Sequence, residues 1–201
     1  MKAPFILGLG IALCLLLTSC VVTSDNPLSS PDATHADQAL VGDWFGKKDQ
    51  DTFHFSATNG PWMHVEIIPA KAGDKIDSYD LFPTVIGANT FLNVVLTGKD
   101  DQGHPTKTYV FLRYSISSDH VLQMWRMSQD AAAAAVQAGK LKGIVQQDKN
   151  PTMVGQPPHP DVNVTLQDTS PNIVRFIQSA DVSALFNDKM EPLYRVNPTG
   201  K

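Results

Sequence analysis

The feature that most constrains this chain is a succession of short apolar or alternating segments, which begins near Leu40 and is broken by turn residues. Alternation of apolar and polar residues is typical of half-buried strands, and short strands joined by tight turns pair as an antiparallel meander. A meander of this length closes into a barrel or stacks as a sandwich. The sequence therefore predicts a mainly β fold, with strands over 41–46, 52–57, 62–69, 78–86, 90–97, 106–117 and 119–127.

Two helices interrupt the strand pattern in the second half of the chain. Ser128 precedes an acidic residue and five consecutive alanines, which predicts a capped helix that ends near Gly139. Ser170 as a cap and Pro171 at the first helical position predict a second helix that runs to Ser179. We expect further strands over 142–146, 162–167 and 192–196.

The hairpin over 52–69 separates its side chains into two faces. If its turn centres on Asn59, Phe55 lies opposite Met63 and His54 lies opposite His64. Pattern and turn then agree, because one face is apolar and the other is polar. We expect Phe53, Phe55, Met63, Val65 and Ile67 to point inward, and His54, Ser56, Trp62, His64 and Glu66 to point to solvent.

The first twenty residues have the pattern of an export signal. A basic residue is followed by an apolar run over 5–17, which is too short to span a bilayer as a helix. The run ends in Leu17-Thr18-Ser19-Cys20, a motif that resembles the lipobox of bacterial lipoprotein precursors. The resemblance implies cleavage before Cys20 and attachment of acyl chains, such as palmitate, to Cys20. A plain signal peptide cut near Ser19 is the alternative.

The lipobox divides the chain into three expected parts. Residues 1–19 are the signal peptide, 20–39 the lipidated Cys and a flexible tether, and 40–201 a single β-rich domain. The chain has two cysteines, and with Cys14 removed and Cys20 lipidated no disulfide forms. Position 21 is Val rather than Asp, and in lipoproteins of Gram-negative bacteria this implies the outer membrane.

A second resemblance concerns the start of the first strand. Gly42-Asp43-Trp44 resembles the Gly-x-Trp motif of lipocalin-like barrels, whose Trp closes one end of the barrel against a basic residue late in the chain. Arg195 lies at the corresponding place, so the resemblance implies a lipocalin-like barrel closed by Trp44 and Arg195. The family's Thr-Asp-Tyr motif is missing, and the alanine-rich helix interrupts the family's order of elements. An ordinary core aromatic at position 44 is the alternative.

The chain carries few signatures of catalysis. Lys and Arg number 16 against 20 Asp and Glu, and the resulting net charge of −4 argues against a nucleic-acid surface. Gly-x-Ser-x-Gly, His-Glu-x-x-His and phosphate-loop motifs do not occur. His54, His64 and Glu66 share one face of the hairpin and form a weak candidate for a metal site. We favour the solvent-face interpretation and expect neither a metal nor a cofactor.

The aromatic residues of the strands leave two interpretations of the interior open, because they either line a ligand cavity or fill an ordinary core. We therefore expect a non-catalytic envelope lipoprotein that binds a small apolar ligand or a protein partner. A structural or interaction lipoprotein without a ligand is the alternative, and a hydrolase or metal-dependent enzyme is least favoured. The aromatic residues concerned are Phe53, Phe55, Phe82, Phe91, Tyr109, Phe111 and Trp125.

Overall fold

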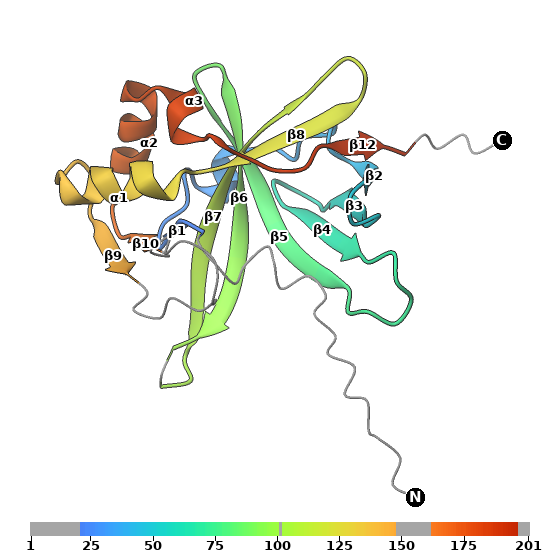
Figure 1. The fold of residues 1–201 in the computed structure, drawn as a ribbon, viewed down its shortest axis with the longest axis horizontal. Coiled ribbons are helices and arrows are strands. Elements are labelled where there is room, and N and C mark those ends of the chain that lie inside the picture. The colour runs from blue at the N-terminus through green and yellow to red at the C-terminus, as the bar shows by residue number, and fades with distance from the viewer. Residues whose placement is uncertain (1–20, 101, 148–161, 197–201) are drawn as a thin grey trace, which may run out of the picture.

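A computed structural model describes residues 21–100, 102–147 and 162–196, and in it eight antiparallel strands close into a barrel (Figure 1). Seven of the strands form the predicted meander, and the last, near the C-terminus, lies between β8 and β2 and closes the barrel. Of the two expected forms, the barrel is the one adopted. Its strands are β2 (Gly42–Gly46), β3 (Thr52–Ala57), β4 (Met63–Ile68), β5 (Asp77–Ile86), β6 (Asn89–Lys99), β7 (Pro105–Ile116), β8 (Val121–Arg126) and β12 (Leu193–Arg195).

The register of the β3–β4 hairpin differs from the predicted one by two residues. Phe55 lies opposite Val65, and His64 lies opposite Ser56 rather than His54. The turn is longer than expected, because the Thr58 N–H donates to the carbonyl of Trp62 (3.0 Å) across three intervening residues. A shift of two residues keeps the strand side chains on their predicted faces, since side chains alternate with a period of two. Trp62 in the turn is the exception, because it was expected to point to solvent and instead packs against Phe82, with ring centroids 5.0 Å apart.

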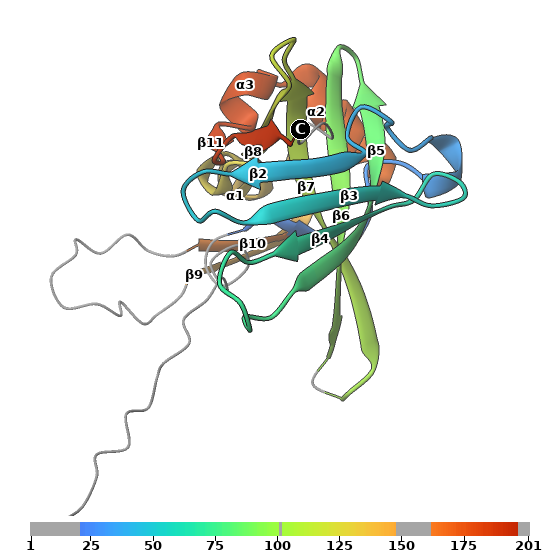
Figure 2. The same cartoon turned by 90° about the vertical axis from the view of Figure 1, so that its right-hand side faces the viewer.

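A second layer packs against the outside of the barrel, over β5, β6 and β7. It contains α1 (Gln129–Gln137), α2 (Ser170–Ser179) and the short α3 (Val182–Leu185). Three strands extend the sheet beyond β7, in the order β1 (Thr23–Ser24), β10 (Val162–Leu166) and β9 (Gly143–Gln147). β2, β3 and β4 form the opposite side of the barrel (Figure 2). A 3₁₀ turn, η2 (Pro31–Ala33), precedes the barrel, and β11 (Asp188–Lys189) pairs with β8.

Both predicted helices form, with one difference at a helix start. Ser128 caps α1 as expected, because its hydroxyl accepts a hydrogen bond from the Ala131 N–H (3.3 Å). Ser170 was expected to cap the second helix, but α2 begins at Ser170 itself and Thr169 is the N-cap. Pro171 is tolerated in the first turn, since the N–H that proline lacks has no partner there in any case.

Strands β6 and β7 are apolar on both faces because each face meets a different core. Phe91 and Phe111 pack in an outer core with the helices, whereas Leu92 and Leu112 belong to the core inside the barrel. The aromatic residues for which cavity lining and ordinary core were both left open therefore divide between the two cores. Phe82, Phe91, Tyr109, Phe111 and Trp125 pack in the outer core, and Phe53 and Phe55 face the interior.

The segment over 21–38 is packed against the body, and the prediction of a flexible tether over 20–39 was wrong for it. Val22 and Leu28 are each 3% exposed. The Leu28 N–H donates to Oδ1 of the fully buried Asn93 (2.7 Å). Isolated apolar residues in a polar stretch look solvated in sequence, yet two of them fill gaps in the outer core. Residues 1–20, with the expected signal peptide and Cys20, lie outside the described residues.

Candidate functional site

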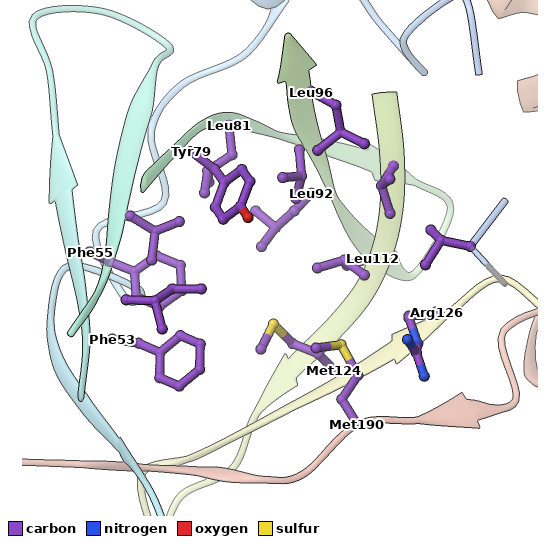
Figure 3. A pocket seen from close by; sticks show the side chains of 15 residues that line it. Phe53, Phe55, Tyr79, Leu81, Leu92, Leu96, Leu112, Met124, Arg126 and Met190 are labelled. Atoms are coloured by element: carbon purple, nitrogen blue, oxygen red, sulfur yellow. The ribbon is translucent and has the colours of Figure 1, made fainter. Parts of the chain in front are cut away.

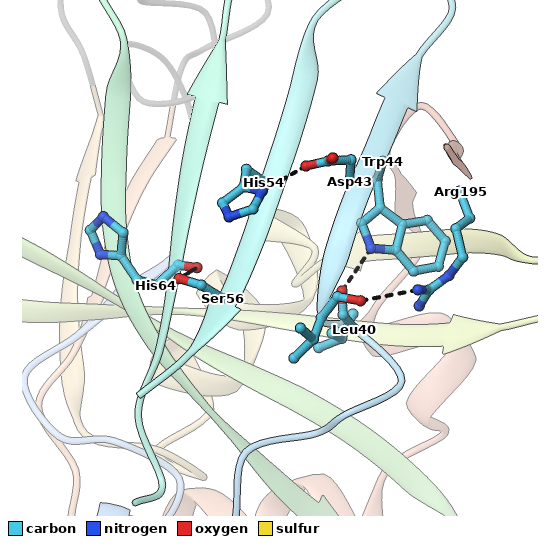
Figure 4. A network of polar contacts seen from close by, with 8 residues as sticks. Leu40, Asp43, Trp44, His54, Ser56, His64 and Arg195 are labelled. Carbon is cyan, nitrogen blue, oxygen red and sulfur yellow. Dashed lines mark hydrogen bonds and ion pairs between the residues drawn. The ribbon is translucent and has the colours of Figure 1, made fainter. Parts of the chain in front are cut away.

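Trp44, on β2, is completely buried in the core inside the barrel. Its ring lies beside Leu40 and Arg195 (Figure 4). Its indole N–H donates to the carbonyl oxygen of Leu40 (2.7 Å), so the polar atom of the ring has a partner. Leu40 is also completely buried. The hydrogen bond ties the first strand of the barrel to the segment that directly precedes it.

Arg195 covers the Trp44 ring from the last strand. Its guanidinium carbon lies 4.5 Å from the ring centroid, which is a cation–π contact. The guanidinium also donates to the carbonyls of Val41 (3.0 Å) and Ala39. A side chain at position 42 would crowd this group, since a Cβ on Gly42 would lie 3.3 Å from Arg195 Nη1. The structure thus brings together the two residues that the lipocalin resemblance singles out.

The weak metal candidate on the hairpin is not assembled as a cluster. His54 Nδ1 lies 2.6 Å from Asp43 Oδ1, and His64 Nδ1 lies 2.9 Å from Asp80 Oδ1. Asp43 on β2 lies directly opposite His54, and Asp80 on β5 lies directly opposite His64. Glu66 on β4 lies opposite His54 on the other side of β3. Across residues 21–100, 102–147 and 162–196, no group of three or more His, Cys, Asp or Glu side chains is placed to hold a metal ion.

Sequence reasoning did not find the two aspartate partners. The signal that identifies them is cross-strand register, because side chains that face each other in a ladder lie close enough to pair. Both histidines are partly exposed, with 43% of the His54 side chain and 36% of the His64 side chain accessible. The solvent-facing orientation expected for them is what the structure has.

The interior of the barrel holds a cavity of about 90 Å³ (Figure 3). Its wall is aliphatic, aromatic and thioether surface, with Tyr79 and Arg126 as the members that carry a polar side-chain group. The complete wall comprises Val21, Phe53, Phe55, Val65, Ile67, Tyr79, Leu81, Leu92, Val94, Leu96, Val110, Leu112, Met124, Arg126 and Met190.

The cavity lies away from the β3–β4 and β7–β8 turns. Met63 directly follows the first of these turns, and Tyr114 and Leu122 flank the second. All three belong to the inner core but not to the cavity wall, so that end of the interior is filled. The cavity reaches the other end, where Ile67 and Arg126 lie near the ends of their strands.

Arg126 is the charged residue of the cavity wall. Its Nε lies 2.7 Å from Asp188 Oδ2, and 26% of its side chain is exposed. The contact is an ion pair without hydrogen-bond alignment, because this buried Nε has no acceptor in good geometry among the residues described. A guanidinium has five N–H donors, so one carboxylate oxygen does not exhaust its capacity for acceptors.

Comparisons with protein-family models, with curated protein sequences and with solved structures found no match. The lipocalin-like and lipoprotein resemblances therefore stay expectations from the residues quoted above. None of the helices in the described part of the chain is long and apolar enough to cross a membrane.

A second hollow, more polar and on the outside of the barrel, has a volume of about 400 Å³. Arg113 and Trp125 line it, with the guanidinium carbon 4.3 Å from the ring centroid. The Tyr114 hydroxyl donates to Asp37 Oδ2 (2.6 Å) at its edge. Burial raises the pKa of this tyrosine well above its usual range, and the hydrogen bond to Asp37 acts in the same direction. Sequence reasoning gave no sign of this hollow, since its residues come from four separate segments.

Proposed function

We propose that this protein is a lipid-anchored envelope protein that binds a slender apolar ligand inside its barrel and does not transform it chemically. The observation that carries the proposal is the internal cavity, whose wall is almost entirely apolar. Apolar surface attracts apolar ligands without directional chemistry, because burying it removes it from water. The envelope location rests on the lipobox resemblance of Leu17 to Cys20.

The size of the cavity limits what it accepts. Sites for drug-sized ligands usually measure about 300–1,000 Å³, whereas this cavity measures about 90 Å³. It suits the end of a single alkyl chain rather than a fused ring system. Each methylene buried there contributes about 0.8 kcal/mol.

Arg126 favours a ligand that carries an acidic group at one end. A guanidinium pairs well with a carboxylate or phosphate oxygen, and Arg126 lies on the wall at the end of β8. A single-chain amphiphile with an acidic head is therefore the class of ligand that fits best. Its tail would contact the aliphatic wall, and its head would share Arg126 with Asp188.

A fluorescent polyene fatty acid tests this proposal, because its emission rises in an apolar site. Residues 21–201, produced without lipid, should bind the probe with a one-to-one ratio. Val94→Trp places an indole ring in the cavity and should abolish binding. Val85→Trp adds the same ring at a position that is 71% exposed, and it should leave binding unchanged. Circular dichroism would establish that both variants fold. Equal binding by the two variants would contradict the cavity as the site.

A structural role without a ligand is the second candidate. It is favoured by the filled half of the interior, where Leu40, Trp44, Met63 and Leu122 are completely buried. Native mass spectrometry separates the two candidates. A protein that never carries extra mass and never binds the probe would support the structural role.

A further inference from the structure

The chain reaches the barrel cavity at its first described residue. Val21 is part of the cavity wall, and Val22 beside it is 3% exposed in the outer core. The residue that precedes Val21 in the sequence is Cys20, the expected site of lipid attachment. The residue expected to carry the lipid is therefore the covalent neighbour of a residue in the cavity wall. Consecutive Cα atoms lie about 3.8 Å apart across a trans peptide.

Val21 is held in place by the strand that follows it. Thr23 pairs with Val110 of β7 on one side and with Thr165 of β10 on the other. Val110 itself lines the cavity. Directly after this strand, the Asp25 N–H donates a hydrogen bond to the Leu166 carbonyl (2.9 Å). The start of the body is thus fastened beside the cavity, where a flexible tether over 20–39 had been expected from the sequence.

We propose that an acyl chain carried by Cys20 occupies the barrel cavity, with the end of the chain among Val94, Leu96 and Val110. The inference rests on the proposed lipid anchoring and names the occupant of the proposed binding site. An acyl chain has the slender shape and apolar character that the cavity accepts. The two ends of this interaction belong to one molecule, so the acyl chain is present at an effective concentration of about the millimolar range.

This arrangement has a consequence for any free ligand. A free amphiphile and the attached acyl chain compete for one cavity, so capture of the first expels the second. The Cys20 lipid in a diacylglyceryl form carries more than one chain, and the chains outside the cavity remain in the membrane. Occupation by one chain is therefore compatible with anchoring.

Photo-cross-linking of the full chain in bacterial membranes tests this. Cells that express the protein are fed a fatty acid with a diazirine and an alkyne, membranes are irradiated, and the purified protein is digested for mass spectrometry. We expect the label on Cys20 to cross-link in the same chain to peptides that contain Val94, Leu96 or Val110. Val94→Trp should lower this cross-link at least tenfold, and Val85→Trp should leave it unchanged. Leu96→Phe provides a second filling variant if Val94→Trp does not fold.

The remaining outcomes separate two kinds of failure. A protein without label at Cys20 would overturn the proposed lipid anchoring, and the present inference with it. Label at Cys20 that cross-links to membrane lipids and never to the cavity would overturn the inference and leave the anchoring intact. Cavity cross-links that persist in Cys20→Ser would show a free fatty acid in the cavity. They would likewise overturn the inference, while supporting ligand binding.

Discussion

Arg195 and Trp44 are expected to be energetically coupled through their stack, and a double-mutant cycle of Trp44→Leu with Arg195→Leu measures the coupling. Trp44→Leu removes the aromatic ring and its hydrogen bond to Leu40, which is worth about 1 kcal/mol, and it leaves a void in the core. We expect a total loss of about 3 kcal/mol. Arg195→Leu removes the cation–π contact and the donors to two carbonyls, at a cost of about 1–3 kcal/mol.

The sum of the two single losses should exceed the loss in the double mutant by about 0.5–1 kcal/mol, because the stack can be lost only once. Urea unfolding followed by circular dichroism gives all four free energies of unfolding. Arg175→Leu is the matched control, since Arg175 is exposed on α2, outside the barrel. It should combine additively with Trp44→Leu. A coupling within error of zero for Arg195 would refute the idea that the stack stabilises the fold.

Three further predictions concern other polar groups. Asn93→Leu should lower the free energy of unfolding by about 1–3 kcal/mol in urea titrations, because the buried Leu28 N–H loses its acceptor; a neutral effect would contradict a stabilising role of this hydrogen bond. Replacing His54 and His64 by Ala should change stability by no more than about 0.5 kcal/mol, as is usual at partly exposed positions, and a chelator should not alter the melting of the wild type. Hydrogen bonds from Asn172 and from the Lys142 backbone lower the pKa of Asp168 below its ordinary 3.8. The carboxylate therefore stabilises the fold above that value, and this contribution is lost as the pH falls through the lowered pKa, so Asp168→Ala should destabilise at pH of about 7 and progressively less in acid. A cost that stays constant down to pH of about 2 would count against this reasoning.

The strands and helices were accessible to sequence reasoning because their signals are local. Alternation, turn residues and capping residues all act within a few positions, and the strand over 52–57 and the alanine-rich helix follow them closely. The choice between barrel and sandwich was not accessible in the same way. It depends on whether β12 pairs with both β8 and β2, and that pairing joins segments far apart in the sequence.

The candidate cavity shows the same division between local and distant signals. Phe53 and Phe55 were assigned to the interior because their hairpin alternates strictly. β6 and β7 carry apolar side chains on both faces, so pattern alone did not tell Phe91, which is outside the barrel, from Leu92, which is inside. Val21 and Met190 reach the cavity wall from the two ends of the described chain, and nothing in their neighbouring sequence marks them for it.

Closure of the barrel by its last strand has a consequence for the order of folding. The hydrogen bond between Arg195 and Val41 joins residues that are 154 positions apart, and contacts of such separation form slowly because a long loop must be ordered first. A chain that emerges with its N-terminus first therefore holds an open sheet, with β2 and β8 as unpaired edges, until residue 195 arrives. Exposed edges of this kind pair readily with other chains. We expect the final few residues to set the rate of maturation, and a chain truncated before β12 to aggregate although nearly all of its core is present.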